Sequence, residues 1–154
     1  MFIKILCFGK LDNRLFQQLF DFYQTKIQKK INFEVIELKE NYQAETKVNL
    51  EVNSNLLQEK INKFSDYEVI LLDVDAPMLS SEEFAQAIAK NKDLKTGKLL
   101  LVIGPSDGYD QAFKMNYPRI SFGKITFPHQ LFRLILAEQI YRALKIIGHE
   151  QYHK

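Results

Sequence analysis

Three short segments of the chain carry side chains or turns that could do chemistry. The first, Gly104-Pro105-Ser106-Asp107-Gly108, directly follows an apolar run. Glycine permits backbone angles and a close ligand approach that other residues forbid. The segment matches neither the dinucleotide-binding fingerprint nor the phosphate-binding loop, whose lysine and Ser/Thr are missing here. It therefore indicates either a ligand-holding loop or a plain turn.

The second segment runs from Lys124 to His129. Thr126 and Pro128 are typical of the start of a helix, and Lys124 and His129 flank that start. One interpretation is a capped helix with a lysine facing solvent. The other is a backbone loop that wraps a small ligand, with His129 close by.

The third segment is the C-terminal tail, which holds His149, Tyr152, His153 and Lys154. Such groups can stack on an exposed base, grip a phosphate or move a proton. A frayed terminus explains the same residues, because the last residues of a chain are often poorly ordered. Both interpretations stay open from composition alone.

Charge and cysteine content exclude several classes of protein. The net charge of +2, from 21 basic and 19 acidic residues, is too small for a protein that coats bare RNA, so any RNA contact must be local. The one cysteine, Cys7, lies in an apolar run, and we expect it to be a small core residue. No Cys/His spacing suggests a metal site.

No targeting or membrane-spanning segment is visible. The N-terminus has no basic leader or cleavage site, and the longest apolar runs are far shorter than a membrane span. We therefore expect a cytoplasmic protein that does not bind a membrane.

Alternating strands and helices must position the three segments. Apolar runs predict strands, and apolar residues spaced by three and four predict helices. The polar stretch 39–53 predicts a long surface loop. This alternation indicates one α/β domain over 1–154 with a largely parallel sheet. The expected strands are 2–8, 33–38, 68–74, 98–103 and 119–122, and the expected helices are 13–30, 55–64, 80–90 and 128–147.

Ligands of parallel α/β sheets bind beyond the carboxyl ends of the strands. Three segments stand at the carboxyl end of a predicted strand: Leu72-Asp73, 104–108 and 122–127. We expect these segments to share one edge of the sheet. The helix over 128–147 is apolar around most of its circumference, which indicates burial on more than one side. Its second side is covered either by a partner subunit or by the chain's own core.

Several motifs together resemble one family. The run from Ser121 to Leu131, SFGKITFPHQL, is similar to a Ser-Phe-Ser-Lys-Met-Thr-hydrophobic-Pro-His-Gln signature. Residues 138–143, the Tyr152-His153-Lys154 ending, 8–11 and 79–82 match further blocks in the same order. The chain thereby resembles the RlmH family of SPOUT methyltransferases, which methylate N3 of a pseudouridine in helix 69 of bacterial 23S rRNA.

This resemblance implies a fold, a cofactor and partners. The fold is a SPOUT-type mostly parallel sheet flanked by helices, with a C-terminal trefoil knot, an exception to the usual avoidance of knots. The implied cofactor is S-adenosylmethionine, and the implied partners are a second copy of the chain, in a homodimer, and helix 69 of the 23S rRNA in the assembled ribosome, with no DNA. The implied cofactor-binding residues are Leu72, Gly104, Phe122, Gly123, Lys124, Ile125, Thr126 and Phe127.

The same resemblance implies where the target base is handled. We expect the Tyr152-His153-Lys154 tail to meet that base, reaching the partner's cofactor pocket, and Arg142 to hold a phosphate or support the developing anion. His129 is either the base that removes the N3 proton or a structural residue. The predicted catalytic residues are thus His129, Arg142, Tyr152, His153 and Lys154, without one assigned general base.

The chain also departs from the family pattern. Gly104-Pro105 stands where the family has two glycines, and Ala76-Pro77 where it has Gly-Lys; Gly123 and Ile125 replace a serine and a methionine. The first two changes favour a rival hypothesis, a catalytically idle RNA- or ribosome-binding module on the same fold. An unknotted flavodoxin-like nucleotide-binding enzyme is a second rival, which leaves the C-terminal motifs unexplained.

Overall fold

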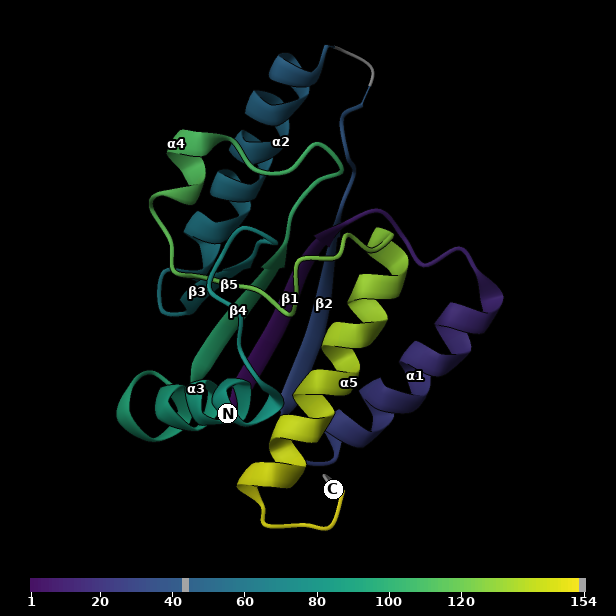
Figure 1. Ribbon diagram of the computed structural model, residues 1–154, viewed down its shortest axis with the longest axis vertical. Helices are drawn as coiled ribbons and strands as arrows, with labels where there is room; N and C mark the ends of the chain where they lie inside the picture. Colours follow the sequence, from purple (N-terminus) through teal and green to yellow (C-terminus); the bar gives the residue numbers. More distant parts are fainter. Residues whose placement is uncertain (43–44, 153–154) are drawn as a thin grey trace.

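The computed structural model describes residues 1–42 and 45–152, and its centre is a parallel β-sheet (Figure 1). The strand order is β2-β1-β4-β3-β5, and every neighbouring pair is parallel. The predicted α/β class is confirmed. The strands are β1 (Phe2–Phe8), β2 (Asn32–Leu38), β3 (Glu68–Leu72), β4 (Lys98–Ile103) and β5 (Arg119–Ile120).

Helices cover both faces of this sheet. One buried apolar cluster joins the sheet to α1, α3 and α5, and a second joins its other face to α2 and α4. Burial on both faces explains why β4 reads as an uninterrupted apolar run. The helices are α1 (Arg14–Gln28), α2 (Thr46–Ile61), α3 (Ser81–Leu94), α4 (Gln111–Lys114) and α5 (His129–Ile147), and a 3₁₀ turn, η1 (Asn62–Phe64), follows α2.

The last helix, α5, lies between α1 and α3 and packs against both. Figure 1 shows it running from the carboxyl edge of the sheet down toward the edge where the N-terminus lies. Most of its apolar circumference is therefore covered within one chain. The remaining apolar side chains are half-buried: Leu131, Phe132, Ile135, Ile146 and Ile147.

The predicted surface loop over 39–53 is wrong, because α2 already begins at Thr46. The face that α2 buries is polar at Asn49, Asn53 and Ser54, so hydrophobic periodicity could not reveal it. Asn53 instead forms hydrogen bonds with the backbone of Asn41, at 2.8 and 2.7 Å. These bonds satisfy amide groups that would otherwise be costly to bury.

Cys7 is buried in the core, as the sequence predicted, with 2% of its surface exposed. Burial raises the pKa of its thiol to about 12, against a smaller lowering by the nearby Arg133 charge. The thiol therefore stays protonated and unreactive at neutral pH.

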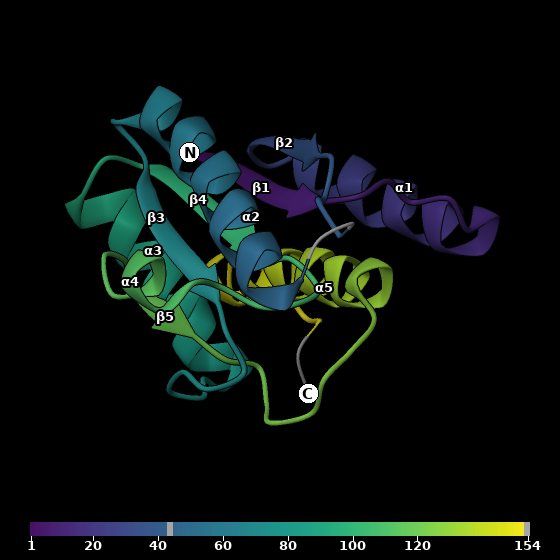
Figure 2. The ribbon, with the colours of Figure 1, turned by 90° about the horizontal axis from the view of Figure 1, so that it is seen from above.

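The connection from β5 to α5 is a long loop that runs outward from the sheet before the helix begins (Figure 2). It contains the 122–127 segment, and it enters α5 at the carboxyl edge of the sheet. None of the helices in the described part of the chain is long and apolar enough to cross a membrane.

Candidate active site

A cavity of about 390 Å³ opens at the carboxyl ends of β3, β4 and β5. Three stretches of chain supply most of its wall: 72–75 after β3, 103–109 after β4, and 120–127 after β5. The strands are parallel neighbours, so their ends meet at one edge, as the sequence predicted. Lys114, His129 and Phe132 complete the lining.

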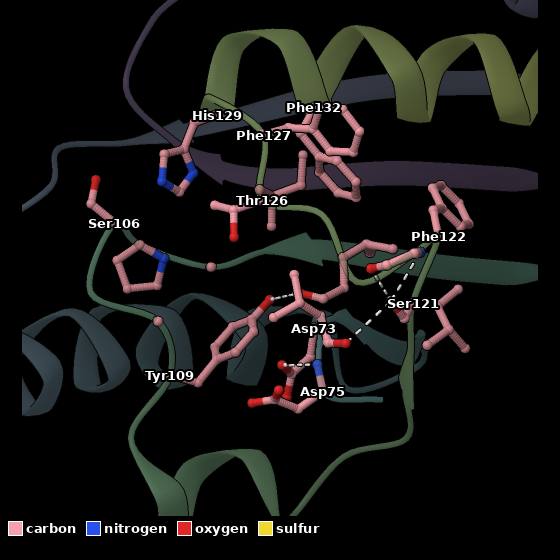
Figure 3. A pocket seen from close by; sticks show the side chains of 18 of the residues that line it. Asp73, Asp75, Ser106, Tyr109, Ser121, Phe122, Thr126, Phe127, His129 and Phe132 are labelled. Atoms are coloured by element: carbon pink, nitrogen blue, oxygen red, sulfur yellow. Dashed lines mark hydrogen bonds between the residues drawn. The ribbon is translucent and has the colours of Figure 1, made fainter. Parts of the chain in front are cut away.

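Opposite sides of the cavity differ in character. Figure 3 shows the rings of Phe127 and Phe132 on one side, with Asp73 and Asp75 across from them. The two rings stack with centroids 6.3 Å apart, and Phe132 also contacts Phe122 at 5.9 Å. The cavity therefore pairs an aromatic wall with an acidic one.

Asp73 carries a charge that neighbouring cations largely balance. Its Oδ2 lies 2.9 Å from an Arg119 nitrogen and 3.7 Å from Lys114 Nζ, while Oδ1 accepts the Asp75 N–H at 3.1 Å. Burial acts to raise the pKa of this carboxyl, but the Asp75 hydrogen bond and the two cations outweigh it and hold the pKa below its ordinary value. Asp73 is thus ionised at neutral pH.

The 104–108 segment forms a turn braced from outside the cavity. The Gly108 N–H donates to the Pro105 carbonyl at 2.9 Å, and Gly108 has a φ of +84°, which suits glycine. The Glu40 carboxylate accepts the Ser106 N–H at 2.6 Å. Pro105, which departs from the family pattern, is accommodated as the first residue of this turn.

Ser121 fixes the beginning of the 122–127 segment. Its buried hydroxyl donates to the Gly123 carbonyl at 2.8 Å and accepts the Gly123 N–H at 3.1 Å. Gly123 has a φ of +143°, a conformation that other residues rarely adopt. The sharp turn between Ser121 and Gly123 directs the following backbone around the cavity.

Comparison with known proteins identifies the family behind this geometry. A family model described as a predicted SPOUT methyltransferase matches residues 1–153. The chain belongs to the SPOUT methyltransferase family. It is therefore an enzyme that transfers a methyl group, and the family resemblance drawn from the motifs is confirmed.

Similar proteins of this family match the chain from end to end. It is 55% identical over 155 residues to the ribosomal RNA large subunit methyltransferase H of Mesoplasma florum, with both chains fully covered. It is 46% identical to the protein of that name in Mycoplasma capricolum subsp. capricolum, also with full coverage. The identity is 37% with that of Caldicellulosiruptor saccharolyticus, over 99% of each chain.

Most residues that the sequence predicted for cofactor binding line the cavity of this SPOUT methyltransferase. They are Leu72, Gly104, Phe122, Gly123, Ile125, Thr126 and Phe127. Lys124 is exposed and is not part of the lining. His129 lines the cavity, and Figure 3 shows its ring on the side where Ser106 lies.

Two of the other predicted catalytic residues, Arg142 and Tyr152, lie far from this cavity within one chain. Arg142 is thirteen residues beyond His129 on α5, and at 1.5 Å per residue this separates them by about 20 Å. Tyr152 packs beside Arg142, whose guanidinium lies 5.0 Å from the ring centroid. His153 and Lys154 lie outside the described residues.

The tail turns back onto α5 at His149, which has a φ of +53°. Tyr152 then packs edge-on against Tyr141, with ring centroids 5.0 Å apart. Its hydroxyl donates to Glu138 at 3.2 Å, and burial together with hydrogen bonding to Tyr23 raises the pKa of this phenol. A neutral phenol and the Arg142 cation thus form one polar cluster at the end of α5.

The lining fits a methyl donor of nucleoside type. Its volume is within the range of small-molecule sites, and its aromatic wall can hold a planar base. The carboxylate of Asp75 favours a ligand with a positively charged group, whereas the charge of Asp73 is largely balanced by Arg119 and Lys114. Among the residues that the structure describes, no group of three His, Cys, Asp or Glu side chains could hold a metal ion.

Among the lining residues that sequence reasoning missed are Tyr109 and Phe132. Phe132 is one of many apolar residues of the last helix, so nothing in the sequence distinguishes it as a residue of the cavity wall. Tyr109 directly follows the 104–108 segment, and a large aromatic residue beside a glycine turn was the available sign.

Proposed function

We propose that this chain transfers a methyl group from S-adenosylmethionine to N3 of a pseudouridine in helix 69 of the large-subunit rRNA. We further propose that it acts as a cytoplasmic homodimer on the assembled ribosome. The observation that carries the proposal is the cavity at the carboxyl ends of β3, β4 and β5, lined by seven of the eight residues that the RlmH resemblance implies for the donor. The names and full-length coverage of the relatives support the rRNA substrate.

The backbone of 122–127 and the ends of β3 and β4 would hold the donor. When bound, S-adenosylmethionine supplies an electrophilic methyl carbon on a sulfonium. The aromatic side chains Phe122, Phe127 and Phe132 exclude water from the place where this group reacts. Asp75 would favour its positive charge.

The target nitrogen must lose a proton as it gains the methyl carbon, since N3 of a pseudouridine carries hydrogen. His129 is half-buried and lines the cavity, so it can accept this proton from a base placed there. The Arg142 cation can stabilise the negative charge that develops on the base. Positioning supplies the rest, because an electrophilic carbon and a prepared nucleophile need chiefly to be held in line.

A second copy of the chain supplies the residues that one cavity lacks. Arg142 and Tyr152 lie about 20 Å along α5 from the cavity of their own chain, too far to touch a base bound there. In an antiparallel dimer through α5, the C-terminal end of each helix would approach the partner's cavity. The half-buried apolar residues of α5 suit such an interface.

A trefoil knot formed by the C-terminal part remains part of this proposal. The outward loop from β5 (Figure 2) and the turn fixed by Ser121 and Gly123 belong to the C-terminal part that would thread through such a knot. Such threading would fix the 122–127 backbone from both sides, which favours a preorganised donor site.

The rival hypothesis of an idle binding module rests on Pro105 and on Ala76-Pro77. Pro105 is the first residue of a turn, where its carbonyl accepts the Gly108 N–H, and it lines the cavity without closing it. The rival predicts weak or absent donor binding.

One experiment tests the proposal directly. The protein is incubated with methyl-labelled S-adenosylmethionine and ribosomes that lack this modification, and the label is mapped on the RNA. We expect label on a pseudouridine of helix 69. Donor binding with no label there would overturn the substrate, and absence of both would overturn the enzyme in favour of the binding module.

A further inference from the structure

Tyr109 occupies the space that a side chain at position 104 would need. A Cβ placed on Gly104 would lie 2.8 Å from Tyr109 Cζ and 3.0 Å from both neighbouring ring carbons. Contacts below 3.0 Å do not occur without something moving. The backbone of Gly104 needs no unusual angle, so glycine is required here by the tyrosine ring alone.

The hydroxyl of Tyr109 connects two strand ends under the cavity. It lies 2.8 Å from the Val102 carbonyl oxygen and 3.1 Å from the Leu72 carbonyl oxygen, and these two acceptors share its one hydrogen. Figure 3 shows the Tyr109 ring beside the cavity. Burial and the nearby Asp73 charge raise the pKa of the phenol well above its ordinary value. The group is therefore a permanent donor that holds β3 and β4 together where the cavity begins.

An aromatic stack keeps the ring from swinging away. Tyr109 stacks on Phe113 with centroids 5.9 Å apart, and Phe113 contacts Tyr117 at 5.2 Å. The Tyr117 hydroxyl exchanges hydrogen bonds of 2.8 and 3.0 Å with Gln58 of α2. The helix α2 thus supports the floor of the cavity through Gln58.

We propose that Tyr109 is the positioning residue of the methyl-donor pocket, shaping it through Gly104 and through the carbonyls of Leu72 and Val102. The ring sets how closely the backbone at 104 can approach a ligand, and the hydroxyl fixes the orientation of the β3 end. This inference rests on the proposed function, because Leu72 and Gly104 are the residues proposed to hold the donor.

The first test separates the hydroxyl from general stability. Tyr109→Phe keeps the ring and removes the hydrogen bonds, while Tyr117→Phe removes a comparable hydroxyl from the same stack without touching the cavity. Equilibrium dialysis with labelled S-adenosylmethionine gives the Kd of each folded variant. We expect about a tenfold rise for Tyr109→Phe and a change below about twofold for Tyr117→Phe. KM for the donor should rise with it, while kcat at saturation stays within about twofold.

The second test is a double-mutant cycle between ring and glycine. Gly104→Ala should raise the donor Kd by at least about tenfold in the native background, because the methyl group collides with the ring. In a Tyr109→Leu background the same change should raise Kd by less than about twofold, since the space is then empty. Circular dichroism spectra confirm that all variants are folded.

The possible outcomes distinguish a failure of this inference from a failure of the proposed function on which it rests. Equal Kd values for the native protein and Tyr109→Phe, or an undiminished cost of Gly104→Ala beside Leu at 109, would overturn the role of Tyr109 alone. An equal rise in Kd for Tyr117→Phe would also overturn the role of Tyr109, because the weaker donor binding would then reflect only a loss of protein stability. A native protein that does not bind S-adenosylmethionine would overturn the proposed function and this inference with it.

Discussion

Glu138 holds Arg142 one turn further along α5, with Arg142 Nη2 donating to Glu138 Oε1 at 2.6 Å. The same oxygen accepts the Tyr152 hydroxyl at 3.2 Å. The hydrogen bond that Arg142 donates to Glu138 raises the pKa of its guanidinium. The Glu138 carboxylate therefore orients both Arg142 and Tyr152, although it does not line the cavity of its own chain.

Glu138→Gln should lower turnover without weakening donor binding. The amide keeps the shape of the side chain but loses the charge that orients Arg142 and Tyr152, and we expect kcat to fall about tenfold. The Kd for S-adenosylmethionine should stay within about twofold, because the cavity lies at the other end of α5. Steady-state methylation of ribosomes and equilibrium dialysis measure the two quantities. Lys92→Gln, an exposed change on α3, serves as the control.

Asp73→Asn should destabilise the fold in a pH-dependent manner. At neutral pH it leaves Arg119 and Lys114 without their shared carboxylate, and we expect a loss of about 2 kcal/mol in the free energy of unfolding. The pKa of Asp73 is lowered below 3.8 in the folded state, so its stabilisation is present above that pH. It is lost as the pH falls through the folded pKa, and native and variant proteins should converge there.

Urea unfolding at fixed protein concentration, from pH 7 down to about pH 3, measures this difference. Asp93→Asn is the matched control, because Asp93 is exposed and lies 3.8 Å from Lys92; it should change stability by less than about 0.5 kcal/mol. A constant difference between native and Asp73→Asn proteins across the acid range would contradict the assignment.

Arg133→Met should cost about 3 kcal/mol of stability, because it breaks a buried ionic network. The guanidinium donates to Glu37 at 2.6 Å and to the Gly9 carbonyl at 2.7 Å, and its residue is only 2% exposed. Arg133→Lys should be intermediate, since an ammonium group cannot reproduce the fork. Thermal and urea unfolding provide the measurement, with exposed Arg14→Met as control. A loss below about 1 kcal/mol for Arg133→Met would refute this account.

The sequence predicted the sheet and the location of the cavity for one physical reason. Buried parallel strands are apolar runs, so β1, β3 and β4 could be read directly, and the rule that ligands lie beyond carboxyl ends placed Leu72 and Gly104 together. The predicted helix over 55–64 covers only the second half of α2, because the first half buries Asn49 and Asn53 through hydrogen bonds rather than through apolar spacing.

Two features of the site needed three-dimensional coordinates. Gly104 and Tyr109 are five residues apart, and no spacing rule states that one requires the other. The distance of Arg142 from His129 follows from helix geometry once α5 is known to be unbroken. Its consequence, that these residues cannot serve one cavity from one chain, depends on where that cavity lies.

Mixed dimers should test whether the tail of one chain serves the cavity of the other. One chain carries Gly104→Ala, which impairs the cavity, and the other lacks Tyr152 to Lys154; the two are co-expressed with different tags. At a donor concentration well below the Kd of the Gly104→Ala cavity, each homodimer should have little activity. A mixed dimer has one site built from an intact cavity and the partner's intact tail. Equal mixing should restore about a quarter of native activity, because about half of the dimers are mixed and each has one working site.

The shortened chain alone should still fold and bind S-adenosylmethionine, since its cavity is intact. Activity that stays at the level of the homodimers would show that each chain uses its own tail, and full activity of the shortened chain would remove the tail from the reaction.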